Sequence, residues 1–274
     1  MIDSILVTLV IYNLKIDESF AFRSLTDALI GGNQSASLFI YDNSIIPQPC
    51  PSHPNWKIEY RHDPSNPGVS KAYNKGFECA KIQNKKWILL ADQDTGFPID
   101  AFDKYLRSLN ESGCSIVVPK LIDQVGIVSP LKFYFGGGQR QKKMVTDQRQ
   151  NLHQFFFHNS GLLISVDVFE KARGYDENLP LDFSDFSFVH RLRKRNDFFV
   201  VASISCAHHL AATSTSTLDE RLLRFASYLK AGYYFKRKYQ SSNWPLTFRF
   251  FLRALKLTFQ YGNFQFLALY FRIR

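Results

Sequence analysis

Apolar runs alternate with amphipathic patterns through the first half of the chain. Four of the runs have the length and the apolar content of strands, and polar or turn-forming residues close them. Between them, residues 17–30 and 70–83 carry apolar residues at helical spacing, and Gly31-Gly32 follows the first of these segments. The predicted strands span residues 4–13, 37–44, 56–62 and 87–94. Near-continuous apolar strands that alternate with helices predict a mostly parallel α/β sheet with helices on both faces.

The pattern is less regular in the second half of the chain. Residues 115–122 and 197–210 are predicted to be strands, and the last of them ends in His208-His209. Residues 127–151 contain FGGGQRQKK and are predicted to be exposed, either as a lid or as an ordinary loop.

Charge is distributed unevenly along the 274 residues. The formal net charge is +10, and residues 218–274 hold 11 Lys/Arg against 2 Asp/Glu, so that segment alone carries +9. The rest of the chain is close to neutral, which predicts a balanced body followed by a basic, aromatic C-terminal region. We expect one domain over residues 1–212, with halves 1–97 and 98–212, and a helical region over residues 213–274.

The C-terminal region contains one strongly amphipathic segment that begins near Pro245. Its polar side carries Arg249, Arg253 and Lys256. Its apolar side carries Phe248, Phe251, Leu252, Leu255 and Phe259. A basic amphipathic helix of this kind favours docking on an anionic membrane surface. The alternatives are packing of the apolar side on the body or on a second copy as a homodimer. No recognisable nucleic-acid motif accompanies the charge, so no nucleic-acid partner is expected.

The sequence also indicates the cellular compartment of the protein. The opening MIDSILVTLVIYN has an acidic third residue and no basic region, which favours a core strand over a signal peptide. No run approaches the ~18 consecutive apolar residues of a membrane span. The four cysteines are far apart and form no C-x-x-C pair, as is typical of thiols in a reducing compartment. We expect a cytoplasmic protein, peripheral on the inner face of the plasma membrane.

Polar residues stand where the predicted strands end. Asn13 ends the first strand, Asp42 and Asn43 end the second, and Asp92 and Asp94 end the fourth. Ligands of parallel α/β sheets bind at the carboxyl ends of the strands, so these side chains should converge on one crevice. Two carboxylates in D-Q-D can hold Mg²⁺ or Mn²⁺ together with substrate phosphates and water. The alternative is a helix cap or a solvated turn.

Three further residues are candidates for chemistry. Asp182 and Asp185 in LDFSDFSF are three apart, so they should share a face on the first turn of a helix, where one can act as a general base. Capping of that helix is the alternative. His208 ends the last predicted strand, and a neutral imidazole there can ligate Mn²⁺. His158 is interpreted as structural.

Several ordered segments together resemble family 2 glycosyltransferases of the GT-A fold, over about residues 4–212. The segments are VTLVIYN, LFIYDNS, NPGVSKAYNKGFECA, LLADQDT, NSGLLIS and FEKARGYDENLPLDFSDFSFVHRLRK. The D-Q-D form is similar to that of the bacterial rhamnosyltransferase-like branch. Two positions depart from the family pattern, because Ser184 stands at the Glu of its usual Glu-Asp pair and Ala211 replaces a Gly after His208.

The resemblance implies a Rossmann-like GT-A domain with a nucleotide-binding half, 1–97, and an acceptor half, 98–212. It implies that Asp42 binds the pyrimidine, that Asp92 faces the ribose or sugar, and that Asp94 ligates the metal. Asp185 would then be the general base, and Asp182 would orient the acceptor. The remaining residues of the implied donor pocket are Asn13, Asn43, Asn66, Gly68, Asn74, Gln93, Asn159, Ser160 and Gly161.

The implied function is inverting transfer of a sugar from a nucleotide-diphosphate donor, dTDP-rhamnose or a UDP-hexose. The implied acceptor is a glycan or a polyprenyl-diphosphate-linked glycan in bacterial surface polysaccharide synthesis, such as O-antigen or capsule. Two alternatives remain open, a catalytically inactive glycan-binding or membrane scaffold subunit and a nucleotidyltransferase-like enzyme.

Overall fold

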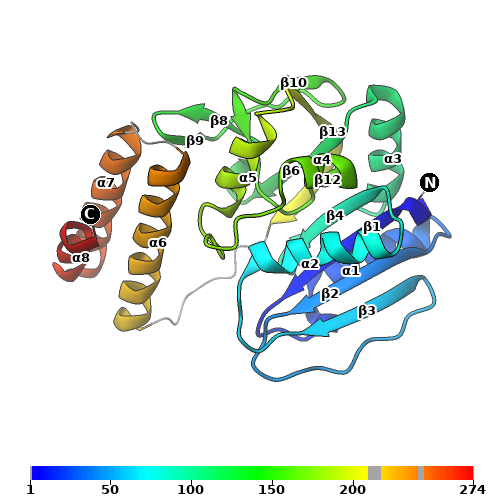
Figure 1. Ribbon diagram of the computed structural model, residues 1–274, viewed down its shortest axis with the longest axis horizontal. Coiled ribbons are helices and arrows are strands. Elements are labelled where there is room, and N and C mark those ends of the chain that lie inside the picture. The colour runs from blue at the N-terminus through cyan, green and yellow to red at the C-terminus, as the bar shows by residue number, and fades with distance from the viewer. Residues whose placement is uncertain (1, 209–216, 240–243, 274) are drawn as a thin grey trace. The chain divides into compact units, whose positions relative to one another are not determined.

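The computed structural model describes residues 2–208, 217–239 and 244–273 (Figure 1). The chain forms two compact units. Unit 1 consists of Met1–Lys132 and Arg140–Leu210, and unit 2 consists of Phe133–Gln139 and Ala211–Arg274. The expected domain boundary at residue 212 and the side chain of His209 lie outside the described residues.

Unit 1 is built on one large mixed sheet with the strand order β10-β13-β6-β12-β4-β1-β2-β3. The strands are β1 (Ile5–Ile11), β2 (Ala36–Asp42), β3 (Trp56–His62), β4 (Trp87–Asp92), β6 (Ile116–Asp123), β10 (Arg149–Asn151), β12 (Leu163–Ser165) and β13 (Phe198–His208). Two short strands extend this sheet, β5 (Thr95–Gly96) beside β13 and β7 (Gly126–Ser129) beside β6. The four strands β3-β2-β1-β4 are parallel, and β12 runs antiparallel between β4 and β6. The predicted α/β class is confirmed.

Burial along the strands follows from helices on both faces of the sheet. Every residue of β1 and β2 is buried, whereas in β3 at the sheet edge only Trp56 is buried and the following residues alternate between exposed and half-buried. The helices of unit 1 are α1 (Phe20–Gly31), α2 (Val69–Ile82), α3 (Ala101–Ser112), α4 (Val166–Lys171) and α5 (Ser184–Leu192). Residues of α1 and α3 share a core cluster with Val7 and Leu9. Thr8, which points to the opposite face, meets α2 at Gly76.

The start of α1 differs from the predicted start at residue 17. Ser19 is the N-cap, and its Oγ accepts a hydrogen bond from the backbone N–H of Phe22. Ile16–Glu18 form a separate 3₁₀ turn ahead of the cap. Because a capping hydroxyl satisfies one of the free N–H groups of the first turn, it fixes where the helix begins.

Two glycines allow close backbone approach around α2. Gly68 is the N-cap of α2 with φ 88°, and a Cβ there would lie 2.3 Å from the carbonyl oxygen of Pro180. Gly76 is inside the helix, and a Cβ there would lie 2.2 Å from Thr8 Oγ1. The close approaches that the sequence suggests at these two positions are therefore present. The one at Gly76 sets how near α2 lies to β1.

The segment 127–151 contains regular structure, in contrast to the predicted loop. It includes most of β7 and all of β10, which both join the large sheet. It also includes β8 (Leu131–Tyr134) and β9 (Gly137–Gln139), and β8 pairs with β11 (Phe155–Phe156) through Leu131 and Lys132. The strands are only three or four residues long, so their patterns are too short to separate from loop in the sequence.

The helices of unit 2 are α6 (Leu218–Tyr239), α7 (Trp244–Tyr261) and α8 (Gln265–Ile273). They pack through aromatic rings, with centroids 5.8 Å apart for Phe225 and Phe266 and 5.6 Å apart for Tyr228 and Phe250. Within the described ranges, no helix combines the length and the apolarity needed to cross a membrane.

The contact between Gly76 and Thr8 gives a stability prediction. Gly76→Ala should lower the free energy of unfolding by about 1–3 kcal/mol, because buried Thr8 would have to move. This loss exceeds the helix-propensity gain of about 1 kcal/mol. Urea denaturation measures it, and the double variant Thr8→Ala/Gly76→Ala should recover most of the loss. Gly96→Ala is the control, since its nearest atom outside the chain neighbours would be 3.7 Å away. Equal stability of Gly76→Ala and the wild type would contradict the packing argument.

Candidate active site

A cavity of about 480 Å³ opens at the carboxyl ends of β1 and β4 in unit 1. These two strands are neighbours at the point where the strand order reverses, which is where parallel α/β sheets bind ligands. Its polar lining residues are Tyr12, Asp92, Gln93, Asp94, Arg140, His158, Asn159, Ser160, Ser184, Asp185 and His208. Seven residues of the predicted site therefore come together here, namely Asp92, Gln93, Asp94, Asn159, Ser160, Asp185 and His208.

The antiparallel strand β12 explains how residues 158–160 reach this cavity. The start of an antiparallel strand lies at the same sheet edge as the ends of its parallel neighbours. Gly161 precedes β12, and its N–H donates to the carbonyl oxygen of Leu90 in β4 at 2.7 Å. Gly161 has φ 79°, and a Cβ would lie 2.4 Å from Pro119, so glycine is needed in this turn.

Asp92 is the last residue of β4, and its partly buried side chain lines the cavity. Its Oδ1 accepts a hydrogen bond from the hydroxyl of Tyr73 on α2, and its backbone N–H donates to Ser160 Oγ at 2.9 Å. Desolvation and the charge of Asp94 raise the pKa of Asp92, the Tyr73 hydrogen bond lowers it, and the pKa ends at about 7. The raised pKa therefore reflects the charge of Asp94 beside this partly buried carboxyl group.

Gln93 joins the ends of β1 and β4. Its Oε1 accepts from the N–H of Tyr12 at 2.7 Å, and its Nε2 donates to the Tyr12 carbonyl at 3.2 Å. Its own carbonyl accepts from Ser19 Oγ at 3.1 Å, which ties the turn to the cap of α1. Gln93 therefore fixes the position of Tyr12 at the cavity wall.

The side chains of Asp94 and His208 lie close together at the cavity. Asp94 Oδ1 and His208 Nδ1 are 3.7 Å apart, and the side chains are 29% and 17% exposed. His208 Nδ1 also lies 3.3 Å from Thr95 Oγ1. A carboxylate and an imidazole are ligands that Mn²⁺ accepts, and Asp92 adds a second carboxylate. In the described part of the chain, no group of three or more acidic, His or Cys side chains is arranged to hold an ion.

Asp185 and His158 form a hydrogen-bonded pair at the cavity. Asp185 lies in the first turn of α5, and its Oδ2 is 2.6 Å from His158 Nδ1. Asp185 Oδ1 accepts from the N–H of Phe186 at 2.7 Å. Burial lowers the pKa of His158, but the hydrogen bond and the charge of Asp185 raise it more, so the pKa ends above its ordinary value. Sequence reasoning missed this role of His158, for which only its place beside Asn159-Ser160-Gly161 gave a signal.

The predicted position of Asp182 on the first turn of that helix is wrong. The helix α5 begins at Ser184, and its N-cap is Phe183 with φ 63°. This left-handed residue turns the chain between the two acids, so Asp182 precedes the helix and does not line the cavity.

Arg140 is a second lining residue that sequence reasoning missed. It stands in the segment predicted to be a loop, and its guanidinium donates two hydrogen bonds to Asp123, at 2.9 Å and 2.7 Å. The paired Arg140 lowers the pKa of the Asp123 carboxyl. It places a permanent positive charge at a cavity whose other charged groups are largely acidic.

Asn159 and Ser160 are held by hydrogen bonds on both sides. Asn159 Nδ2 donates to Ser184 Oγ at 3.1 Å, and its Oδ1 accepts from the hydroxyl of Tyr175 at 2.8 Å. Ser160 Oγ donates to Thr95 Oγ1 at 2.8 Å. These bonds link the turn before β12 to α5 on one side and to the end of β4 on the other.

The other predicted donor residues lie outside this cavity. The carboxylate of Asp42 is fully buried and accepts from the N–H of Ser44 at 2.9 Å, from Gln48 Nε2 at 3.0 Å and from the hydroxyl of Tyr60 at 2.9 Å. The bond to Ser44 is the Asx-turn interaction. The N–H of Asn13 donates to Ser44 Oγ at 2.8 Å, and the N–H of Asn43 donates to the carbonyl of Ile11 at 2.8 Å. All three residues thus border the ends of β1 and β2.

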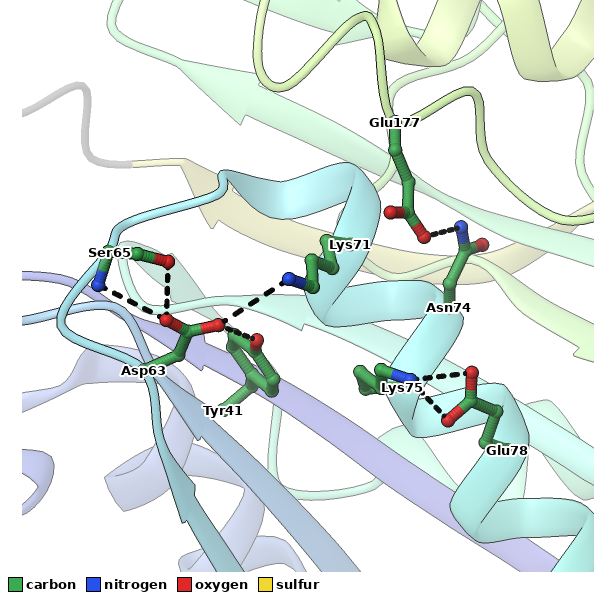
Figure 2. Close-up of polar contacts among 8 residues, drawn as sticks. All are labelled: Tyr41, Asp63, Ser65, Lys71, Asn74, Lys75, Glu78 and Glu177. Atoms are coloured by element: carbon green, nitrogen blue, oxygen red, sulfur yellow. Dashed lines mark hydrogen bonds and ion pairs between the residues drawn. The ribbon is translucent and has the colours of Figure 1, made fainter.

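Figure 2 shows the start of α2 and the polar residues around it. Asn74 Nδ2 donates to the Tyr175 carbonyl at 3.0 Å and to Glu177 Oε1 at 2.9 Å, so this side chain holds the loop before α5. Asn66, with φ 45°, lies in the turn before α2. In that turn Asp63 accepts from the hydroxyl of Tyr41 at 2.6 Å.

The cluster around Asp63 was not identified from the sequence. Hydrogen bonds from Ser65 and Tyr41 and the charge of Lys71, 3.8 Å away, lower the pKa of Asp63 to about 2. Asp63 therefore stays ionised, and Lys71 stands beside it at the edge of the sheet.

A mixed α/β sheet with a polar cavity at its reversal point is the arrangement in which α/β proteins bind their ligands. The family described as glycosyl transferase family 2 matches residues 37–173, which are 137 of the 274 residues. The chain belongs to glycosyl transferase family 2.

Solved structures similar to this chain share its fold at low identity. GalNAc-T7 with UDP, GalNAc and Mn²⁺ matches with a TM-score of 0.56 and 12% identity, over 86% of this chain and 48% of that one. TarS 1–349 from S. aureus in complex with UDP-GlcNAc matches with a TM-score of 0.51 and 12% identity, over 83% of this chain and 66% of that one. The chain spans 44% of another TarS structure. No curated protein matches.

The pair His158–Asp185 predicts a pH effect. Replacing Asp185 by Asn removes the two largest effects that raise the pKa of His158, whereas the desolvation that lowers this pKa stays and only the weaker effects of Asp92 and Val128 still raise it. The His158 pKa in Asp185→Asn should therefore fall below that in the wild type, as measured by NMR titration of the imidazole C–H signals. Asp182→Asn is the control and should leave the pKa unchanged. Equal pKa values in Asp185→Asn and the wild type would show that the pair does not form.

Proposed function

We propose that this protein is an inverting, metal-dependent glycosyltransferase. It transfers a sugar from a nucleotide-diphosphate donor to a hydroxyl group of a glycan acceptor. One observation carries the proposal. A single cavity brings the carboxylates Asp92 and Asp94 together with His208 and with the hydrogen-bonded pair Asp185–His158. The first group suits a diphosphate with its metal, and the second suits removal of a proton.

Asp94 and His208, with Asp92, would hold Mg²⁺ or Mn²⁺ on the donor side. A bound divalent cation supplies neutralisation of the charge that develops on the leaving diphosphate. The chain's own contribution is orientation. Tyr73 holds Asp92 at the end of β4, and Gln93 holds Tyr12 across from it. Arg140 adds a fixed positive charge for phosphate or acceptor groups.

Asp185 would accept the proton of the attacking hydroxyl on the acceptor side. Its two oxygens are positioned by His158 and by the N–H of Phe186, so the carboxylate has a defined orientation before substrate binds. A base on the face opposite the leaving group gives in-line attack, which inverts the anomeric configuration. Asp182 precedes this helix and would contact the acceptor beyond the cavity.

The donor would be dTDP-rhamnose or a UDP-hexose, with dTDP-rhamnose suggested by the D-Q-D form. The pyrimidine base of the donor nucleotide would lie near Asp42. The surrounding loops would be shaped by Asn13, Asn43, Asn66, Gly68, Asn74 and Gly161. The structure of TarS with UDP-GlcNAc and that of GalNAc-T7 with UDP and Mn²⁺ support a nucleotide-sugar and metal on this fold.

The acceptor would be a glycan or a polyprenyl-diphosphate-linked glycan in bacterial surface polysaccharide synthesis. The protein would act in the cytoplasm, peripheral on the inner face of the plasma membrane, with residues 213–274 as a basic helical region that follows the catalytic domain in the sequence.

A catalytically inactive scaffold subunit is the second candidate, and a nucleotidyltransferase-like enzyme is the third. Released nucleoside diphosphate, rather than pyrophosphate, distinguishes the proposal from the third.

Nucleotide binding tests the donor side. A ligand that binds only the folded state raises the Tm, by an amount that grows with its concentration over Kd. We expect one of dTDP, UDP, GDP and CDP to raise the Tm in the presence of Mn²⁺ and to do so much less without it. Asp94→Asn should remove the metal-dependent part of the rise. Absence of stabilisation by all four nucleotides would favour the scaffold alternative.

The general base is tested separately. Asp185→Asn should reduce turnover by about 10²–10⁴-fold, because the amide cannot accept the proton. The same variant should keep the Mn²⁺-dependent rise in Tm with the nucleotide, since Asp185 stands on the acceptor side. Nucleoside diphosphate release measures turnover. Unchanged turnover would refute the assignment of Asp185.

A further inference from the structure

The helix α7 is apolar on two sides, and only one of them packs within unit 2. The inner side consists of Leu246, Phe250, Ala254 and Thr258, which are all buried. Of the stripe predicted from the sequence, Phe248, Leu252 and Phe259 are exposed on the other side, whereas Phe251 and Leu255 are half-buried, and Trp244 adds an exposed ring. Trp244, Phe248, Leu252 and Phe259 are 65%, 42%, 47% and 82% exposed. Their spacing of four, four and seven residues places them on one face of the helix.

A turn from a distant part of the sequence extends this stripe. Tyr134 and Phe135 are 64% and 43% exposed and belong to the same compact unit as α7. The ring centroid of Phe135 lies 5.3 Å from that of Trp244 and 6.3 Å from that of Phe248. Arg249 Nη1 donates to the carbonyl of Tyr134 at 3.2 Å and so ties the turn to the helix. We call these six residues the docking face: Tyr134, Phe135, Trp244, Phe248, Leu252 and Phe259.

Positive charge borders the docking face. Lys236, Arg237 and Lys238 end α6, and Lys236 Nζ donates to Thr247 Oγ1 at 2.7 Å, which places this basic cluster beside the first turns of α7. Lys256 is exposed farther along α7. Residues 218–274 carry +9 in total, so a second copy would bring like charges together, whereas an anionic surface would complement them.

We propose that the docking face inserts into the lipid–water interface of an anionic membrane, with α7 lying in the plane of the surface. Tryptophan and tyrosine favour that interface, and Phe and Leu on one side of a basic helix bury their apolar area there. Phosphate groups of anionic lipids would meet the basic cluster. This inference deepens the proposed function by naming the surface of its membrane docking, but no residue of the docking face lines the active-site cavity.

Co-sedimentation of the full chain with vesicles tests the proposal. The vesicles are phosphatidylcholine alone or phosphatidylcholine with phosphatidylglycerol. The wild type should bind the anionic vesicles and lose binding at about 1 M salt, where charges are screened within ~3 Å. Trp244→Ser/Phe248→Ser/Phe259→Ser should bind the anionic vesicles at least about tenfold more weakly. The matched control is Ile30→Ser/Phe198→Ser/Ile82→Ser, whose side chains are 54%, 46% and 81% exposed in unit 1. The control should bind like the wild type.

Each outcome decides the proposal. Equal binding of the two triple variants, or equal binding of the wild type to neutral and anionic vesicles, would overturn it. A wild-type dimer that the first variant converts to monomer, without vesicle binding by either, would assign the docking face to a second copy instead. The Mn²⁺-dependent rise in Tm with nucleotide should persist in the first variant. If the wild type shows this rise in Tm but does not bind vesicles, the docking face is rejected and the transferase proposal stays intact.

Discussion

The partly buried carboxyl group of Asp92 is the constraint on which the arrangement around the cavity depends. A carboxylate that is buried beside a second carboxylate is unfavourable unless donors are fixed around it. Tyr73 is such a donor, and it comes from α2. Tyr73 and Gly76 are one helical turn apart, so the glycine that lets α2 approach β1 also brings the Tyr73 hydroxyl within reach of β4. Packing in the interior and chemistry at the sheet edge are therefore coupled through one helix.

The second organising feature is the direction of β12. The residues from Asp92 to Asp94 stand at the end of a parallel strand, and the residues from His158 to Ser160 precede the start of an antiparallel one. Both groups therefore meet at the same edge of the sheet without a long excursion of the chain. Ser160 links them directly, since it accepts from the N–H of Asp92 and donates to Thr95. This single hydroxyl group therefore couples the turn that carries His158 to the residues that follow β4.

Much of the fold of unit 1 could be predicted because its signals are local. The strands β2, β3 and β4 begin within a residue of the predicted positions, and the D-Q-D acids stand at the strand end where the pattern placed them. The misses concern backbone conformation and distant contacts. Nothing in LDFSDFSF shows that Phe183 adopts a left-handed conformation, which separates Asp182 from α5. Arg140 and His158 reach the cavity only through the topology of the sheet, which lies beyond any local pattern. The same is true of Phe135, which meets α7 across more than a hundred residues.

The registers around β12 also bear on how chains of this kind can diverge. The short strand is locked on one side to β4 and on the other to β6, through Leu163 and Ile164. Chain length between β6 and β12 can therefore change without displacing the residues that flank it. Insertion or deletion in the turns of residues 126–151 could remodel the rim of the cavity around Arg140, while the ends of β4 and β12 stay in register. The shape of the cavity could then diverge at little cost to Asp92, Asp94 and Ser160.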